Sequence, residues 1–321
     1  GQVNAFTTKE HTCYYCRTLD IHLQQAAGLL CDMFFHSSFA EKEMNLERQV
    51  IIEEIGMYED TPEDLVSELL TGAIYDGYAL GRPILGTPQT LKSMTGQTLR
   101  DYRAQCYTPE NTVVALCGSY RDEDLAMLTE VFGKMEKRPA PRRDDAQYKP
   151  SLVTKKKDIE QNHLMLCFPA LPAGSDRRYD LQVLNNALGG GMSSRLFQKV
   201  REESGLCYAI YSFSTAYAGT GILGVYTALS QQTELQALGL IRQEIDRLLK
   251  DGLTQSELSR NVEQLKANVV MGMESTSSRM MSVARSEFTY GRAQTPEDII
   301  RGFDAVTRES VLALAHDIFD F

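Results

Sequence analysis

The sequence of 321 residues lacks most features that assign a chain to a class at sight. It has no run of about eighteen apolar residues, the length that a helix needs to cross a membrane, and no visible signal peptide. Its net charge of −10 argues against nucleic acid and anionic membrane surfaces as partners. With 43% hydrophobic and 24% charged residues, the composition predicts a globular protein with room for about two domains.

Metal-binding and disulfide patterns are also scarce. The five histidines are scattered, and none forms an H-x-x-H, H-x₃-H or H-x-x-E-H cluster, so these residues alone do not encode the usual three-ligand zinc site. Seven cysteines, an odd number, favour reduced thiols and a cytoplasmic, reducing compartment. Cys13 and Cys16 have C-x-x-C spacing, but the surrounding pattern is that of a strand, where these two positions point to opposite faces.

One helical segment carries carboxylates where apolar residues are expected. A capping box at Ser38–Glu41 predicts its start, and Thr61–Pro62 predicts its end and the first position of the next helix. Glu47 and Glu54 are two turns apart and are predicted to lie at the centre of the apolar face. An unpaired buried carboxylate costs several kcal/mol, so we expect a cation or dense hydrogen bonding there. The apolar positions of this face are Met44, Val50, Ile51, Ile55 and Tyr58.

An internal repeat divides the chain into two similar halves. The segment 139–150, rich in proline and charge, is the predicted linker between a first domain, residues 1–138, and a second domain, residues 151–321. Amphipathic helices mixed with alternating strands predict an α+β fold, in which each domain has a mixed or antiparallel sheet with helices on one face.

The two halves differ in ways that matter for function. When Glu43 is aligned with Glu257, the second half has asparagines at 261 and 268 in place of the two carboxylates, so only the first copy is suited to a cation. The strand and helix that open the second half have no counterpart in the first. We therefore expect about fifty residues of the first domain to precede Gly1, and a last strand matching Asn111–Gly118 to follow Phe321. The sequence leaves open whether a targeting signal lies ahead of Gly1.

Three stretches carry a family resemblance: GQVNAFTTKEHTCYY, ERQVIIEEIGMYEDTPED and GGGMSSRLFQKVREESGLCYAIYSF. Together they resemble the pitrilysin/insulinase family of zinc metallopeptidases, and within it the mitochondrial processing peptidase and its bacterial relatives. The resemblance covers essentially the whole chain. It implies a zinc-dependent endopeptidase that acts on peptides or unfolded segments, built as a homo- or hetero-dimer of similar subunits.

The resemblance also implies a zinc site. The family combines H-x-x-E-H with a downstream glutamate in the pattern E-R-x-V-I-x-x-E. By this resemblance Glu54 is a zinc ligand, and Glu47 is a second carboxylate that orients a ligating histidine. H-x-x-E-H is absent from these residues; in the family it precedes the strand that opens this chain. The chain is thus expected to be either a fragment that is inactive alone or a non-catalytic homologue serving as a structural or substrate-presenting partner.

The same resemblance indicates where a peptide would bind. Asn4, Ala5 and Phe6 match an edge strand to which an extended substrate adds through main-chain hydrogen bonds. Arg201 and Tyr208 match an Arg-x₆-Tyr pair that holds the scissile carbonyl or its developing oxyanion. From the pattern alone, an ordinary strand, an exposed helix-end arginine and a core tyrosine are the competing interpretations.

The glycines at 189–191 precede a helical segment. They do not form a P-loop, because no Gly-Lys-Ser/Thr follows. A flexible hinge, a substrate-contacting loop and a plain helix break are all compatible with the pattern. The neighbouring Arg195 is expected to be a structural or surface residue.

Overall fold

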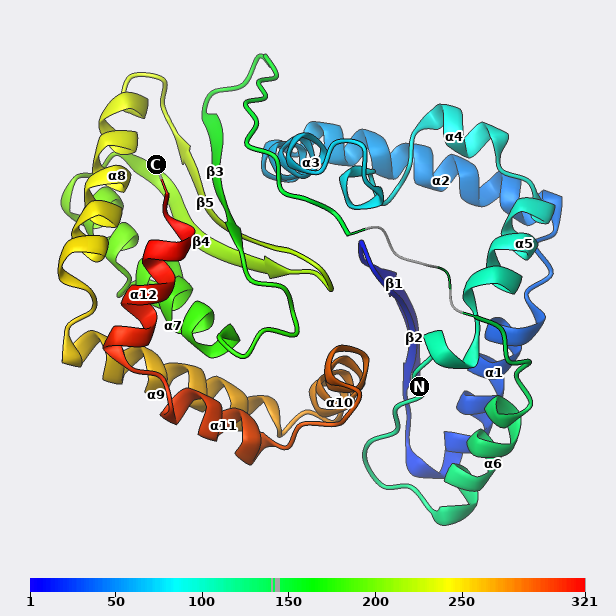
Figure 1. Cartoon of the computed structure of the whole chain (residues 1–321). Coiled ribbons are helices and arrows are strands. Elements are labelled where there is room, and N and C mark those ends of the chain that lie inside the picture. Colours follow the sequence, from blue (N-terminus) through cyan, green and yellow to red (C-terminus); the bar gives the residue numbers. More distant parts are fainter. Residues whose placement is uncertain (140, 142–144, 321) are drawn as a thin grey trace. The chain divides into compact units, whose positions relative to one another are not determined.

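The computed structural model of the protein describes residues 1–139, 141 and 145–320, so the predicted linker is described only in part. The chain forms two compact units that interleave along the sequence (Figure 1). The first unit consists of Gly1–Thr61, Tyr78–Asp144 and Ser275–Ala293, and the second of Pro62–Gly77, Asp145–Glu274 and Gln294–Phe321.

Each unit contains one helix that would belong to the other unit if the chain were divided at a single point. α3 (Pro62–Ile74) belongs to the second unit, although it follows directly on α2 (Glu41–Asp60) of the first. α10 (Thr276–Tyr290) belongs to the first unit, although it follows α9 (Gln255–Gly272) of the second. Helices and antiparallel strands are mixed in both units, which confirms the predicted α+β class.

The first unit contains one antiparallel hairpin surrounded by helices. β1 pairs with β2 in register from Gln2↔Arg17 to Thr7↔Thr12. Its regular elements are β1 (Gln2–Thr7), β2 (Thr12–Arg17), α1 (Leu23–His36), α2, α4 (Pro88–Ser93), α5 (Gly96–Cys106), α6 (Asp122–Gly133) and α10, with single 3₁₀ turns at Asp20–His22, Ala79–Gly81 and Pro109–Asn111.

An aromatic cluster links the hairpin of the first unit to its helices. The ring of Phe34 in α1 lies 4.8 Å from that of Tyr107 and 5.4 Å from that of Phe132 in α6. Tyr14 of β2 shares a hydrogen bond of 2.9 Å with the Tyr107 hydroxyl. Such aromatic pairs stabilise by about 0.5–1.5 kcal/mol beyond the area they bury. These pairs matter here because few of the described hydrophobic side chains of this unit are buried. Ala27 is one of those few.

The predicted boundary between α2 and α3 is confirmed, whereas the predicted start of α2 is wrong. α2 ends at Asp60 and α3 begins at Pro62. At the other end the N-cap of α2 is Ala40, and no side chain caps the helix. The reason is that Phe39 adopts a φ of 48°, which leaves Ser38 two residues ahead of the cap.

The strand predicted within Asn111–Gly118 is absent from the structure. Residues 112–117 are described but belong to neither of the two sheets. A strand needs a partner for its main-chain groups, and the described residues of the first unit offer only the β1–β2 hairpin.

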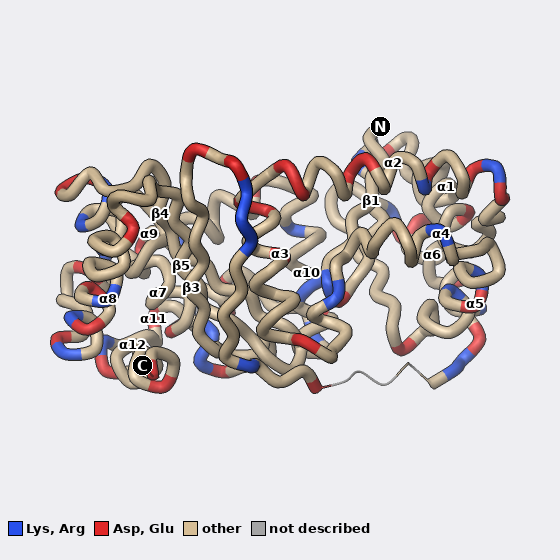
Figure 2. Tube along the Cα trace, turned by 90° about the horizontal axis from the view of Figure 1, so that it is seen from above, with Lys and Arg blue, Asp and Glu red and all other residues tan. Residues whose placement is uncertain are grey.

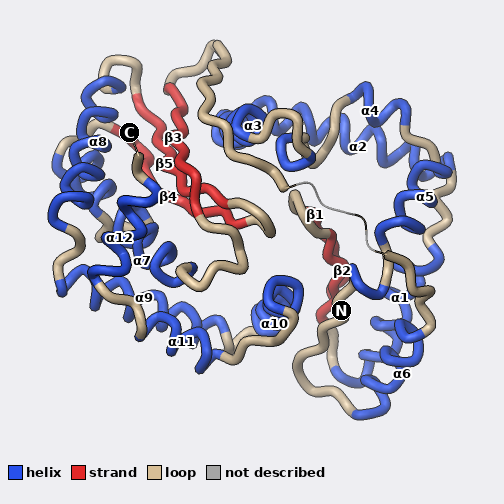
Figure 3. The backbone as a smooth tube through the Cα atoms, in the orientation of Figure 1, coloured by secondary structure: helices blue, strands red, loops and turns tan. Residues whose placement is uncertain are grey.

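The second unit is built around a three-stranded antiparallel sheet with strand order β3-β5-β4 (Figure 3). β5, the central strand, is buried along its entire length. The elements are α3, β3 (Asn162–Ala170), α7 (Arg178–Gly189), a π-helical turn labelled η4 (Phe197–Glu203), β4 (Cys207–Ala216), β5 (Gly221–Leu229), α8 (Glu234–Asp251), α9, α11 (Pro296–Asp304) and α12 (Arg308–Ile318).

The two faces of this sheet are covered by different helices. Ser212 of β4 donates to the carbonyl of Asn185 in α7 at 2.8 Å, whereas its neighbour Tyr211 donates to the Glu63 carboxylate of α3. Because successive side chains of a strand point to opposite faces, α7 and α3 lie on opposite sides of the sheet. The fully buried Tyr75, just after α3, adds a 3.3 Å hydrogen bond to the Thr220 hydroxyl.

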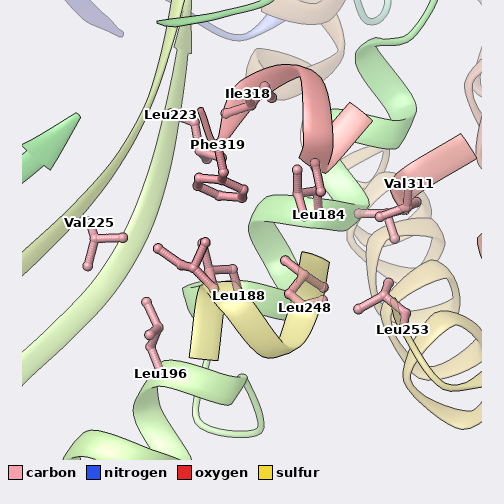
Figure 4. Close-up of a cluster of buried hydrophobic side chains, with 14 of the residues drawn as sticks. Leu184, Leu188, Leu196, Leu223, Val225, Leu248, Leu253, Val311, Ile318 and Phe319 are labelled. Carbon is pink, nitrogen blue, oxygen red and sulfur yellow. The ribbon is translucent and has the colours of Figure 1, made fainter. Parts of the chain in front are cut away.

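The main core of the second unit lies between the sheet and the helices on the α7 side. Figure 4 shows Leu184 and Leu188 of α7 pointing toward side chains of the sheet and of α8 and α12. The labelled residues of this cluster are Leu184, Leu188, Leu196, Leu223, Val225, Leu248, Leu253, Val311, Ile318 and Phe319.

The exposed surface is mixed in charge. Figure 2 shows acidic and basic residues interspersed along the helices, and α8 carries an exposed pair, Arg242–Asp246, at 2.9 Å. Such surface pairs contribute about 0–1 kcal/mol each. Among the described residues, no helix has the length and hydrophobicity that crossing a membrane requires.

An ion pair fixes the start of α9 in the second unit. Thr254 and Glu257 form a capping box, and Arg195 binds the Glu257 carboxylate through two nitrogens at 2.7 and 2.9 Å. Burial raises the pKa of Glu257, but hydrogen bonds from Arg195 and Thr254 and the Arg195 charge outweigh it and lower the pKa from 4.5 to about 2.

Replacing Leu188, which is 0% exposed, tests the core of the second unit. Leu188→Ala is expected to lower the free energy of unfolding by about 2–5 kcal/mol, because a buried cavity adds to the lost transfer free energy. Urea denaturation measures the change. Leu235→Ala in α8 is the matched control, since Leu235 is 84% exposed and its loss should change stability little. Equal effects of the two substitutions would contradict the described core.

The depressed pKa of Glu257 predicts a pH-dependent stability. Its ionised form is favoured by folding, so its contribution is complete above pH 4.5 and is lost as the pH falls toward 2. Near neutral pH, Glu257→Gln should lower the free energy of unfolding by about 1–2 kcal/mol, and the difference from the native protein should shrink through that acid window. Glu263→Gln, at an exposed position of the same helix, should show no such trend. A pH-independent difference for Glu257→Gln would rule out this role.

Candidate functional site

Glu47 and Glu54 leave α2 two turns apart, as predicted, but their predicted burial is wrong. Both side chains are exposed, and α2 has no buried residue. The physical reason is that α2 packs mainly against α4, through Arg48, which donates to the carbonyls of Leu91 at 2.9 Å and Met94 at 3.0 Å. The glutamates lie on another part of the helix surface, where water solvates their charges.

The described residues do not by themselves form a zinc centre. They contain no group of three or more histidine, cysteine, aspartate or glutamate side chains placed to hold a metal ion. A protein zinc site takes three or four such ligands. Glu47 and Glu54 are solvent-exposed oxygen donors with no hydrogen bond or ion pair to any described residue. The described residues therefore supply a carboxylate pair that can contribute to a metal site, but not the complete set of ligands.

The C-x-x-C cysteines lie on β2, as the strand pattern predicted. Cys13 is opposite Phe6 and Cys16 opposite Val3, and both thiols are half-buried. Burial raises the pKa of each thiol. Protonated thiols on opposite faces of a strand are poor metal ligands and poor nucleophiles.

β1 presents an open edge made of main-chain groups. All six of its residues are exposed, and β2 is its only partner among the described strands. The hairpin closes with a hydrogen bond from Thr8 N to His11 O at 2.8 Å. Hydrogen-bonded and non-bonded pairs alternate along an antiparallel ladder, so Val3, Ala5 and Thr7 turn their main-chain groups away from β2.

The main-chain amide of Ala5 shows this outward orientation directly. It donates to the side-chain oxygen of Asn4 at 2.8 Å and not to β2. The ring of Phe6 packs against two other rings of the hairpin. Its centre lies 5.9 Å from that of His11 and 6.1 Å from that of Tyr15. The three residues predicted to bind substrate therefore have distinct positions: Ala5 supplies the edge amide, Asn4 caps it, and Phe6 anchors the hairpin.

Arg201 and Tyr208 are brought together at one place in the second unit. The Arg201 guanidinium carbon lies 5.7 Å from the centre of the Tyr208 ring and 4.7 Å from that of Phe197. Tyr208 is 74% exposed, so the interpretation as a core tyrosine is wrong. Stacking engages the face of a guanidinium and leaves its N–H groups able to donate to a carbonyl oxygen.

Two local irregularities produce this pair, and sequence reasoning missed both. Arg201 lies in the π-helical turn η4, a rare geometry that is frequent at functional sites. Tyr208 is the extra residue of a β-bulge, because Cys207 pairs with Leu229 and Ala209 with Ala228. The bulge turns the phenol outward. Gly205, with a φ of 62°, joins the turn to β4 and is the only local signal of the irregularity.

The thiol beside this pair, Cys207, is held in its protonated form. Burial raises the pKa of Cys207, and the nearby Arg201 charge and a hydrogen bond with Thr227 only partly offset that rise. The thiol is therefore protonated near neutral pH.

A second polar cluster, on the α3 side of the sheet, was not singled out from the sequence. Tyr211 donates to Glu63, and the Tyr226 hydroxyl shares a hydrogen bond of 2.8 Å with His163. Burial and the Glu63 charge raise the pKa of Tyr226 to about 12, while burial lowers the pKa of His163. Burial and the hydrogen bond to Glu63 also raise the pKa of Tyr211, so both phenols stay protonated. Tyr211 joins α3 to the sheet, whereas Tyr226 joins β5 to β3. The alternation of the YAIYSF segment is the signal that places Tyr211 on this face.

Two family models match the chain. Residues 1–88 match the model described as insulinase (peptidase family M16), and residues 93–265 match the model described as peptidase M16 inactive domain. The chain is 43% identical over 320 residues to the uncharacterized zinc protease YmxG of Bacillus subtilis, covering 99% of this chain and 78% of that protein. It is 37% identical to an uncharacterized zinc protease of Streptomyces coelicolor, covering 99% of this chain and 72% of that one.

Solved structures share the fold. A peptidase M16 inactive domain protein from Pseudomonas fluorescens matches with a TM-score of 0.91 at 21% identity, over 99% of this chain and 78% of that chain. A protease from Helicobacter pylori matches with a TM-score of 0.87 at 17% identity, over 99% and 79% of the two chains. Together with the sequence relatives, these matches confirm the resemblance, and the chain belongs to the insulinase (M16) family of peptidases.

Proposed function

We propose that the protein is a zinc-dependent endopeptidase that acts on peptides or unfolded segments bound in extended form. The observation that carries this proposal is the open edge of β1, where the Ala5 amide is directed away from the hairpin and, among the described residues, is bonded only by the side chain of Asn4. An extended peptide can replace that side chain and add a strand to the edge. Main-chain pairing is insensitive to sequence, so varied substrates are expected, and folded proteins are expected to be poor ones.

The Arg201–Tyr208 pair is proposed to hold the peptide carbonyl that is attacked. A guanidinium and a phenol are both hydrogen-bond donors, and donors placed where negative charge develops are worth several kcal/mol in acyl transfer. Tyr208 and Arg201 are both accessible to a substrate, since neither side chain is buried.

Glu54 is proposed as the zinc ligand that this chain contributes, with Glu47 as the carboxylate that orients another ligand. Support comes from the relatives named as zinc proteases and from the exposure of both carboxylates on one helix. The described residues do not supply the remaining ligands. We therefore expect the chain alone to be inactive. From the family resemblance, we expect the active form to be a homo- or hetero-dimer of similar subunits.

The second candidate function is that of a non-catalytic homologue which presents substrate or stabilises an active partner. It is favoured by the match of residues 93–265 to an inactive-domain model and by the incomplete metal-ligand set of the described residues. The two candidates share peptide binding and differ in hydrolysis.

Glu54→Gln in the natural protein should abolish zinc binding and peptide hydrolysis, because an amide is a much weaker zinc ligand than a carboxylate. Glu47→Gln should lower zinc affinity by about 10–100-fold, as loss of an orienting carboxylate does. Zinc content after dialysis against a chelator and hydrolysis of a fluorogenic peptide are the measurements.

Glu53→Gln is the matched control for this experiment, since Glu53 is exposed on the same helix one position before Glu54. It should leave both readouts unchanged. Unchanged hydrolysis in Glu54→Gln would remove Glu54 from the site. A native protein that binds peptide but never hydrolyses it would establish the non-catalytic function instead.

Ala5→Pro tests the strand edge, because proline removes the outward amide and is tolerated on an edge strand. The chain should bind fluorescein-labelled unfolded casein about 2–10-fold more weakly, the cost of one hydrogen bond. Fluorescence polarisation measures the affinity. Ala5→Val keeps the amide and should bind like the native chain, whereas native-like binding by Ala5→Pro would exclude strand addition at this position.

A further inference from the structure

The loop that follows α7 is fixed through its carbonyl groups. Gly191 O accepts from the amide and hydroxyl of Ser194 at 3.0 and 2.5 Å. Met192 O accepts from the Gln198 side chain at 2.7 Å, and Ser193 O accepts from Arg260 of α9 at 3.4 Å. Three successive carbonyls thus have partners, which is the pattern of an ordered loop and not of a flexible hinge.

The last turn of α7, from which this loop starts, is attached to α9 by side-chain amides. Asn186 donates to the oxygens of Asn261 at 2.7 Å and Gln264 at 3.2 Å, and Asn261 donates in turn to Glu257 O at 2.7 Å. A side chain at Gly190 would lie 2.5 Å from the Asn186 oxygen. The glycine is therefore needed for this close approach.

The end of the loop is attached to α9 by the ion pair of Arg195 with Glu257. Arg195 also donates to Gly252 O at 2.8 Å, and the two charged side chains are only 12% and 18% exposed. Its remaining terminal nitrogen, Nη1, is buried without a partner among the described residues. A largely buried ion pair with an unpaired donor is a costly way to stabilise a fold, which favours a geometric role.

The segment held in this way leads directly into η4 and Arg201. The far end of the turn is closed by Gly205 N donating to Arg201 O at 2.9 Å and by Leu206 N donating to Val200 O at 3.1 Å. A π-helical turn is less favourable than an α-helical one and persists where its surroundings fix it. The position of the guanidinium over Tyr208 therefore depends on where the turn starts.

We propose that Arg195 and Glu257 are positioning residues, whose bidentate pair fixes the start of η4 against α9 and so holds Arg201 at Tyr208 for a bound peptide. The proposal rests on the proposed function, because it assigns Arg201 and Tyr208 to substrate. In this role Arg195 affects the position of Arg201, which a residue that served stability alone would not do. Lysine cannot replace arginine in that role, since a single ammonium lacks the two-pronged geometry.

The test uses an indole as a local reporter. The chain contains no tryptophan, so Tyr208→Trp introduces the only one, at an exposed position. In that background, Arg195→Lys should lower the fluorescence anisotropy of the indole and shift its emission, because the guanidinium of Arg201 is no longer held over the ring. In the Tyr208 background, Arg195→Lys should weaken binding of fluorescein-labelled unfolded casein by about tenfold.

Lys199→Ala is the matched control. It removes a partly exposed ion pair with Glu203 within the same turn, so anisotropy and casein affinity should stay unchanged. Arg201→Ala in the indole background is the positive control and gives the emission of an indole without its stacked guanidinium.

A change in urea stability with unchanged anisotropy and affinity would overturn the proposal and leave Arg195 a merely structural residue. Should Arg195→Lys fail to fold, Glu257→Gln, which keeps a neutral hydrogen-bonding partner, provides the same readouts with the same expected direction. A native chain that does not bind casein would overturn the proposed function, while the anisotropy would still decide the positioning role.

Discussion

The three-stranded sheet of the second unit buries its central strand completely, and both of its faces must therefore be covered. The helices that follow the sheet strands in sequence cover one face, where Ser212 bonds to α7. The other face receives α3, a helix from early in the chain, through Tyr211 and Tyr75. The interleaved course of the chain follows from this need, because a sheet buried on one face only would leave β5 against water.

The first unit is stabilised by an aromatic cluster and not by a buried sheet. This arrangement suits the proposed peptide binding. Its aromatic cluster around Phe34 fixes the hairpin to α1 and α6, while β1 and most of α2 stay exposed. Segments with few buried contacts are the ones that can rearrange when a ligand arrives. The peptide binding proposed for β1 would require only a small rearrangement, in which the Asn4 side chain leaves the Ala5 amide.

The sequence predicted periodic features well and contact-dependent features poorly. Helical spacing placed Glu47 and Glu54 on one helix, but burial depends on what packs there, and α4 packs elsewhere on α2. Asn111–Gly118 has the composition of a strand and lacks a described neighbour to pair with. Arg201 and Tyr208 were singled out only through the family resemblance. The π-turn and the bulge that join them have Gly205 as a local signal, but a glycine by itself does not specify either geometry.

The glycines at 189–191 show why composition alone left three interpretations open. Glycine is associated with flexibility, yet here it permits close approach: a side chain at Gly189 would lie 2.3 Å from the Ser212 amide nitrogen, and one at Gly190 would collide with Asn186. The absence of side chains lets α7 contact the sheet and the amides of α9 at once. That contact makes the following loop rigid, because its carbonyls and Arg195 can then all reach their partners. These glycines thus make this part of the chain ordered, and the ordered loop in turn fixes the position proposed for Arg201.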